Sequence, residues 1–176
     1  MTLTNSAIVP ETLRTLLVEE KTVGLIVKGT SMLPYLKEGD RVWIKKVEWD
    51  RLRVGDLLAF EQNQVIFTHR LIKKSAGGLL TKGDNNLFPD TPIAPHQILG
   101  KAIGFERMGK TYSLDRKRGF INTFLGYSHA GIGMVGSILL KFFKLTKGKL
   151  RRPMLWVGKG CLIPLQIVER IILYAE

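Results

Sequence analysis

The spacing of apolar residues changes twice along the chain, and each change marks a different kind of element. Leu13, Leu16 and Leu17 recur at helical spacing behind Pro10, so residues 10–20 are predicted to form a short amphipathic helix. From residue 22 onward, short β-branched and aromatic runs alternate with turn residues, a pattern typical of strands. The predicted strands cover residues 22–28, 41–47, 56–61, 65–73, 79–81 and 98–105, with hairpin turns at 62–63 and 77–78.

The C-terminal part has a third pattern, in which apolar stretches are interrupted by glycine and lysine. Residues 119–140 contain no Asp, Glu, Lys or Arg and are long enough to span a bilayer, but their glycine and polar residues lower both hydrophobicity and helix propensity. We therefore expect a helical hairpin or an interfacial segment there. Residues 138–150 interleave aromatic and basic side chains, which suits a membrane surface, and residues 154–175 are predicted to dock on the core or contact lipid.

Chain length and charge divide the molecule further. A chain of 176 residues can bury one real core, so we expect a helix at 1–22, a β-domain at 23–106 and a basic, apolar helical appendage at 107–176. The formal net charge is +12, and residues 106–176 alone hold 13 basic and 4 acidic residues. Such a surface attracts polyanions, either anionic lipid or nucleic acid, and charge alone does not choose between them.

Two further features of the sequence indicate the cellular compartment of the protein. The single cysteine, Cys161, excludes an internal disulfide and is expected to be a small core residue. Charged residues interrupt every apolar run among the first thirty residues, so no signal peptide or membrane anchor is predicted there. We therefore expect a cytoplasmic protein.

The candidate nucleophile is Ser31. Gly29 permits a sharp bend before it and Pro34 stiffens the chain after it, so the hydroxyl and the backbone N–H are both expected to be exposed where a strand leaves the sheet. That placement suits a nucleophile whose own N–H helps to hold an oxyanion. Met32 and Pro34 are expected to wall the substrate site. An isolated serine in a turn is usually structural, so the assignment depends on a partner base.

The best candidate for that base is His69, within the predicted strand 65–73. His96 lies in a turn and His129 in the glycine-rich C-terminal part, and both are weaker candidates. Arg70 cannot replace His69, because a guanidinium stays protonated. Lys73 and Lys74 are formal alternatives for a serine–lysine dyad, but their place beside a Gly-Gly turn predicts solvated side chains.

A carboxylate is needed to orient the histidine, and two are available. Asp90 is the first choice and Asp84 the second, both in a turn-rich stretch that turn chemistry alone could explain. No cluster has metal-ligand spacing and no phosphate-binding loop is present, so neither a metal nor a cofactor is predicted.

Five segments that include these residues follow one another in a fixed order. They read GTSMLP (29–34), VGDLLAF (54–60), THR (68–70), LTKGDNN (80–86, with Asp90 beyond) and ILGKA (98–102). In this order they resemble the signal peptidase I superfamily of S24/S26-type serine peptidases, and within it the serine–histidine branch of the endoplasmic reticulum and archaea. The resemblance covers about residues 23–106. It implies a twisted β-fold, a Ser31–His69–Asp90 mechanism and cleavage after small residues.

The sequence departs from that pattern twice. Members of the superfamily usually carry a transmembrane helix before the nucleophile strand, whereas residues 1–22 are too charged to form one. Gly29 occupies a position where many members have a hydroxyl residue, so the oxyanion site is expected to rest on the Ser31 N–H with help from Thr30. The first departure favours a cytoplasmic protease that trims a leader-bearing peptide and lies on an anionic membrane through residues 119–176, with a spanning C-terminal segment as the alternative.

Two other functions are compatible with such a β-fold. A non-catalytic peptide-binding module would hold its ligand by strand addition, without turnover. A self-cleaving regulator would pair serine with lysine and follow a DNA-binding domain, but the base position here holds His69, and the residues before the core are too few for a helix-turn-helix domain. Nucleic acid is therefore not an expected partner.

Overall fold

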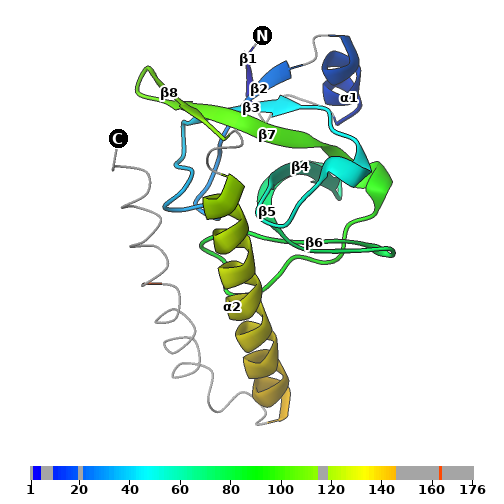
Figure 1. Cartoon of the computed structure of the whole chain (residues 1–176), viewed down its shortest axis with the longest axis vertical. Helices are drawn as coiled ribbons and strands as arrows, with labels where there is room; N and C mark the ends of the chain where they lie inside the picture. The colour runs from blue at the N-terminus through cyan, green and yellow to red at the C-terminus, as the bar shows by residue number, and fades with distance from the viewer. Residues whose placement is uncertain (1, 5–9, 20–21, 115–118, 146–162, 164–176) are drawn as a thin grey trace.

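The computed structural model is mainly β, as predicted, with one helix near each end of the described chain (Figure 1). It describes residues 2–4, 10–19, 22–114, 119–145 and 163. The elements are β1 (Thr2–Thr4), α1 (Pro10–Glu19), β2 (Thr22–Ile26), β3 (Arg41–Lys45), η1 (Trp49–Arg51), β4 (Leu57–Gln62), β5 (Val65–Ser75), β6 (Gly78–Lys82), η2 (Pro95–Gln97), β7 (Ile98–Arg107), β8 (Lys110–Ser113) and α2 (Gly119–Leu145).

The strands form one sheet in the order β1-β2-β3-β7-β4-β5-β6, with β8 paired to β7. β1 runs parallel to β2, and the other pairings are antiparallel. The register shifts at Trp43/Ile44, at Ala59/Phe60 and between Leu71 and Lys73. Such irregularities bend strands and increase their twist, and β4 and β5 accordingly curve strongly in Figure 1.

Two clusters of buried apolar side chains cover the two faces of this sheet. Along β4, Leu57 and Ala59 enter the larger cluster, whereas Leu58 and Phe60 enter the smaller one. The alternation follows from the two-residue period of a strand. The larger cluster also holds Leu13 and Leu17 of α1, which confirms that the N-terminal helix packs on the β-domain.

The sequence pattern located six strands within a few residues of their observed bounds, but it missed β1 and β8. Both are short edge strands of three and four residues, too short to show a period. The two hairpin turns lie one residue away from the predicted positions. The first uses Asn63 and Gln64, both with positive φ (52° and 62°), and in the second Gly78 already pairs with Ser75 in the ladder.

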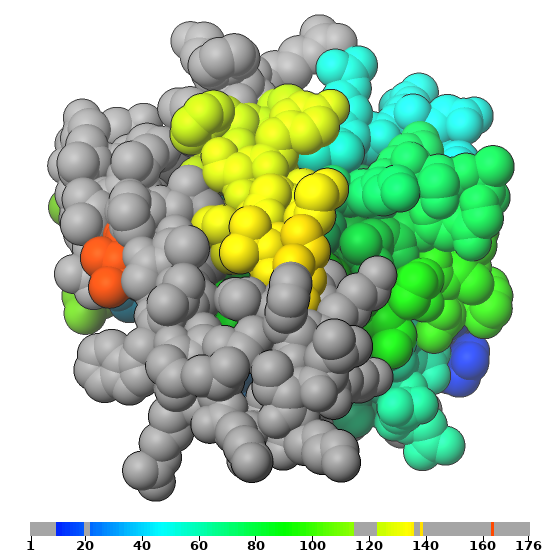
Figure 2. Space-filling view, turned by 90° about the horizontal axis from the view of Figure 1, so that it is seen from below, coloured from blue at the N-terminus to red at the C-terminus, as the bar shows by residue number. Residues whose placement is uncertain are grey.

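The predicted helical hairpin at residues 119–140 is wrong, because this stretch lies within one continuous helix, α2, of 27 residues. Two of its glycines, Gly126 and Gly133, allow close contact with the β-domain instead of breaking the helix. A Cβ at Gly126 would lie 2.5 Å from the backbone nitrogen of Gly55, and one at Gly133 would lie 3.0 Å from Cγ of Pro89. Figure 2 shows α2 directly against the β-domain.

No helix in the described ranges is both long and apolar enough to cross a membrane. The predictions for residues 146–150, for Cys161 and for most of 154–175 fall outside the described residues. The division into segments 1–22, 23–106 and 107–176 stays a prediction.

Candidate active site

The Ser31 turn begins two residues after β2 ends and is tied to the sheet at its base. Gly29 adopts a φ of +78°, a conformation that glycine reaches without strain. Val27 N–H donates to the Asp40 carbonyl at 2.8 Å, and Gly39 N–H donates to the Val27 carbonyl at 3.0 Å. The loop therefore leaves and rejoins the sheet at one place, which holds Ser31 at the edge of the β-domain.

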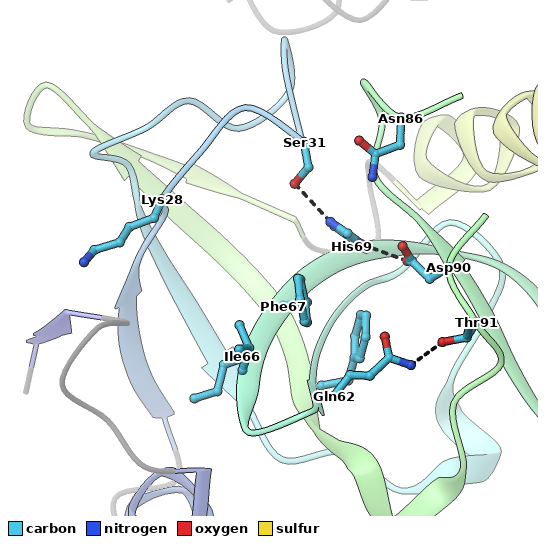
Figure 3. A pocket seen from close by; sticks show the side chains of 11 residues that line it. Lys28, Ser31, Gln62, Ile66, Phe67, His69, Asn86, Asp90 and Thr91 are labelled. Atoms are coloured by element: carbon cyan, nitrogen blue, oxygen red, sulfur yellow. Dashed lines mark hydrogen bonds and ion pairs between the residues drawn. The ribbon is translucent and has the colours of Figure 1, made fainter. Parts of the chain in front are cut away.

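His69 lies on β5, and its imidazole bridges Ser31 and Asp90 (Figure 3). The distance from its Nε2 to Ser31 Oγ is 3.0 Å, and that from its Nδ1 to Asp90 Oδ2 is 2.7 Å. The rings of Phe60 and Phe67 lie 5.9 and 5.7 Å from the imidazole, and only 4% of His69 is exposed. The structure thus brings together three side chains that are 21 and 38 positions apart in the sequence.

Thr81 of β6 holds the carboxylate of this triad in place. Its hydroxyl donates to Asp90 Oδ2 at 2.8 Å, and its carbonyl accepts the Asp90 N–H at 2.9 Å. A carboxylate only accepts hydrogen bonds, so Nδ1 of His69 carries the proton and Nε2 is left as the acceptor for the Ser31 hydroxyl. The sequence does not indicate this role of Thr81, because a threonine in a strand carries no local sign of it.

Asp84, the second candidate for the orienting carboxylate, lies elsewhere. Its two oxygens accept a bidentate pair from Arg70, from Nε at 2.8 Å and from Nη2 at 2.6 Å. Burial raises the pKa of Asp84, but its interactions with Arg70, His129 and Lys82 together outweigh that effect, so the pKa lies below its ordinary value and the group is ionised. Geometry therefore gives the two carboxylates different partners, His69 for Asp90 and Arg70 for Asp84.

Sequence reasoning missed a second group of buried polar residues around Asp84. His129 of α2 places Nε2 3.3 Å from Asp84 Oδ1, and Nζ of Lys82 lies 3.2 Å from His129 Nδ1. Lys82, Asp84, Arg70 and His129 are all fully buried. Nothing local in the sequence predicts the contact between Lys82 and His129, since 47 positions separate them.

The loop after β6 packs directly on the Ser31 turn. Asn85 N–H donates to the Ser31 carbonyl at 2.8 Å, and Nδ2 of Asn85 donates to the Thr30 carbonyl at 3.1 Å. A Cβ at Gly83 would come within 2.7 Å of the Ser31 carbonyl oxygen, so this close approach requires glycine. The loop thus fixes the backbone on which the serine sits.

A pocket of about 550 Å³ opens beside the three side chains. An apolar side formed by aromatic and aliphatic residues meets a polar side that includes the triad. The lining residues are Lys28, Ser31, Phe60, Gln62, Val65, Ile66, Phe67, His69, Asn86, Asp90 and Thr91. Met32 and Pro34, the predicted wall of the substrate site, do not line this pocket, because both are buried and Met32 belongs to the larger core cluster.

The remaining candidates for a base lie away from Ser31. Nζ of Lys74 donates to the Trp49 carbonyl at 2.8 Å, and Lys73 is exposed on the same strand, β5. His96 is exposed in η2. Within the described part of the chain, no three His, Cys, Asp or Glu side chains are grouped so that they could hold a metal ion.

Comparison with known proteins shows two groups of relatives. The catalytic subunits sec11 of the signal peptidase complex from Pyrenophora tritici-repentis and Sclerotinia sclerotiorum are 28% and 29% identical over 100 residues, covering 46% of this chain and 56% of each relative. A sugar fermentation stimulation protein homolog from Thermotoga maritima is 38% identical over 79 residues, covering 44% of this chain and 34% of that protein. The chain thus spans between a third and somewhat over half the length of these relatives.

The profile of one protein family matches a larger part of the chain. The match covers residues 5–103, more than half of the sequence, and it includes Ser31, His69 and Asp90. Together with this match, the sec11 relatives relate the chain to the signal peptidase I and S24/S26 superfamily. The chain belongs to the Peptidase S24-like family.

Proposed function

We propose that the protein is a serine endopeptidase of signal-peptidase type, with Ser31 as nucleophile, His69 as general base and Asp90 as the orienting carboxylate. The observation that carries this proposal is the continuous hydrogen-bonded line from Ser31 Oγ through the imidazole to Asp90 Oδ2, at 3.0 and 2.7 Å. Asp90 holds the tautomer that leaves Nε2 free to accept the serine proton. Some relatives are named as signal peptidase subunits and others as sugar fermentation stimulation protein homologs. The geometry of the three side chains favours a peptidase function for this chain.

Each residue has a defined part in the proposed reaction. Ser31 Oγ attacks the scissile carbonyl carbon while its proton passes to His69 Nε2, and the carbonyl oxygen becomes an oxyanion. The Ser31 N–H, with help from Thr30, is the proposed donor to that oxyanion. His69 then returns the proton to the leaving amine. Water, deprotonated by His69, hydrolyses the acyl-enzyme ester and regenerates the serine.

The substrate is proposed to bind as an extended peptide along the pocket. β6 pairs with β5 from Arg70 to Ser75, and the pocket borders the other half of β5 at Val65, Ile66 and Phe67. A peptide can therefore add beside this half of β5 by main-chain hydrogen bonds, with its side chains over the apolar wall. The family resemblance implies small residues before the cleaved bond and a leader-bearing peptide as substrate.

An anionic membrane surface on the cytoplasmic side is the proposed site of action. Apolar side chains of α2 are exposed, and the helix contains no Asp or Glu. The exposed residues are Phe124, Tyr127, Met134, Val135 and Ile138. The basic residues of 106–176 add attraction to anionic headgroups, worth about 1 kcal/mol for each Lys or Arg near the surface. Vesicles with phosphatidylserine are expected to bind the protein, and neutral vesicles much less; equal binding to both contradicts this part of the proposal.

The catalytic proposal is tested with a leader-bearing peptide that carries small residues before the cut. The purified protein should cleave the peptide and react at Ser31 with a fluorophosphonate. Ser31→Ala and His69→Ala should each abolish cleavage, and Ser75→Ala, in an exposed hairpin, serves as the matched control. Retained cleavage in Ser31→Ala rejects the assignment. Peptide binding without turnover would instead support a peptide-binding module.

A further inference from the structure

The buried polar group next to the proposed triad joins three elements that are far apart in the sequence. Arg70 comes from β5, Lys82 from β6 and His129 from α2, and all three surround Asp84 in the loop after β6. Each of these four side chains is fully buried. Polar groups that are buried in this way are costly unless they are paired, so their mutual hydrogen bonds decide how the elements dock.

The polar contacts of this group can all be satisfied by one assignment of donors and acceptors. The Lys82 ammonium has only protons to give, so it donates to Nδ1 of His129 at 3.2 Å and to the Gly83 carbonyl at 3.1 Å. His129 Nε2–H then faces Asp84 Oδ1 at 3.3 Å, while Arg70 occupies both oxygens of the same carboxylate. A neutral imidazole with its proton on Nε2 satisfies both neighbours.

This group is joined to the residues that carry the proposed chemistry through their neighbours in the chain. Arg70 follows His69 in β5, so the bidentate pair ties the strand of the base to the Asp84 loop. In the same loop, Asn85 N–H donates to the Ser31 carbonyl. His129 therefore contacts a carboxylate whose loop joins the strand of the base to the turn of the nucleophile.

α2 approaches the surroundings of Asp84 at two further points, one in the turn before β4 and one in the loop after β6. Gly126 lies against Gly55, whose carbonyl accepts a hydrogen bond from Arg70 Nη1 at 3.1 Å. One helical turn beyond His129, Gly133 lies against Pro89, the residue before Asp90. Close approach at both glycines places His129, between them, within hydrogen-bond range of Lys82 and Asp84.

We infer that His129 is a positioning residue for the proposed peptidase, through which α2 holds the Asp84 loop, and with it Ser31 and His69, in reactive geometry. This inference rests on the proposed function. It makes the described part of the C-terminal segment a component of the active site. A misplacement of about 1 Å in a reacting group can lower the rate about 10²-fold. Loss of this positioning is therefore expected to lower kcat.

The test compares two substitutions of the same histidine. His129→Leu removes the contacts with Lys82 and Asp84 and is expected to lower kcat for a leader-bearing peptide by about 10²-fold with KM little changed. His129→Gln offers a carbonyl oxygen to Lys82 and an amide N–H to Asp84, so it should restore most of the rate. His96→Gln, at the exposed histidine of η2, is the matched control and should leave kcat unchanged.

Two outcomes overturn the inference. One is wild-type kcat in folded His129→Leu, and the other is an equal loss in His129→Leu and His129→Gln. Lys82→Met removes the other partner of the same contact and must show the same loss of kcat, which keeps the test valid if His129→Leu does not fold.

A second measurement separates this inference from the proposed function. Hydrogen exchange at the Asn85 amide, which donates to the Ser31 carbonyl, should be faster in His129→Leu than in the wild type and close to wild type in His129→Gln. That result supports the positioning role even if no peptide is cleaved. Unchanged Asn85 exchange in folded His129→Leu overturns it, even if the wild type is an active peptidase.

Discussion

Asp84 and Asp90 show how the surroundings of a residue decide its role. Both carboxylates lie in one loop, six positions apart, and in the sequence either could orient His69. Asp90 accepts hydrogen bonds from His69 and from the Thr81 hydroxyl, whereas Asp84 is enclosed by Arg70 and His129. In the proposed mechanism, the first orients His69 and the second holds the loop.

Asp90→Asn is predicted to reduce kcat by about 10⁴-fold while the fold is kept, because an amide that donates to His69 selects the wrong tautomer. KM should change little, since the substitution alters neither the apolar side of the pocket nor its volume. Steady-state kinetics with a leader-bearing peptide measures this. Asp50→Asn, at an exposed aspartate of η1, is the control. A small loss of kcat in Asp90→Asn would remove Asp90 from the proposed mechanism.

At the scale of elements, α2 shows that glycine in a helix can serve packing. Glycine lowers intrinsic helix propensity by about 1 kcal/mol relative to alanine, which is why the sequence favoured a broken helix. In the structure, Gly126 and Gly133 lie so close to the β-domain that an added Cβ atom would force its neighbours to move. A Cβ at Gly131 would meet nothing within 4 Å. The loss in propensity at Gly126 and Gly133 is thus offset by close docking.

Gly126→Ala is predicted to destabilise the protein by about 1–3 kcal/mol, because the added methyl group overlaps the backbone of Gly55. Gly131→Ala adds the same methyl group on the exposed side and should be neutral or stabilising by up to about 1 kcal/mol. Urea unfolding of both variants measures the difference. Equal unfolding free energies would show that α2 does not dock through Gly126.

At the scale of the whole molecule, buried charge joins the β-domain to the C-terminal helix. The Arg70–Asp84 pair lies where β5, β6 and α2 meet, and its neighbours Lys82 and His129 come from β6 and α2. Removing one member of a buried ion pair typically costs about 3–5 kcal/mol, because the other charge is left uncompensated. Stability should therefore depend on the ionisation of Asp84.

The pH dependence of stability follows from the lowered pKa of Asp84. On acidification, the unfolded chain binds this proton first, at about pH 3.9. The contribution of ionised Asp84 to folding stability is therefore fully present above that pH, and it is lost as the pH falls towards the pKa of Asp84 in the folded state. Asp84→Asn should be less stable by about 3–5 kcal/mol at pH 7 and should lose less stability between pH 5 and 3 than the wild type. Parallel pH curves from urea unfolding would contradict this.

The sequence by itself determined six of the described strands, the N-terminal helix and the three side chains of the candidate triad. Two-residue and helical periods record which faces are buried, so Val65–Ser75 and Pro10–Glu19 were recognisable from local pattern. Ser31, His69 and Asp90 were identifiable because their short motifs follow one another in a specific order, and the structure brings their side chains into hydrogen-bond contact.

Only the tertiary structure decided which carboxylate meets His69, that α2 is one helix, and that Lys82 and His129 are buried together. These features depend on contacts between residues 14 to 47 positions apart. The free energy of such a contact depends on burial and on every neighbouring charge, and neither quantity is encoded in a local pattern. The same reason explains the glycines of α2, whose effect on the helix depends on the surface that they meet.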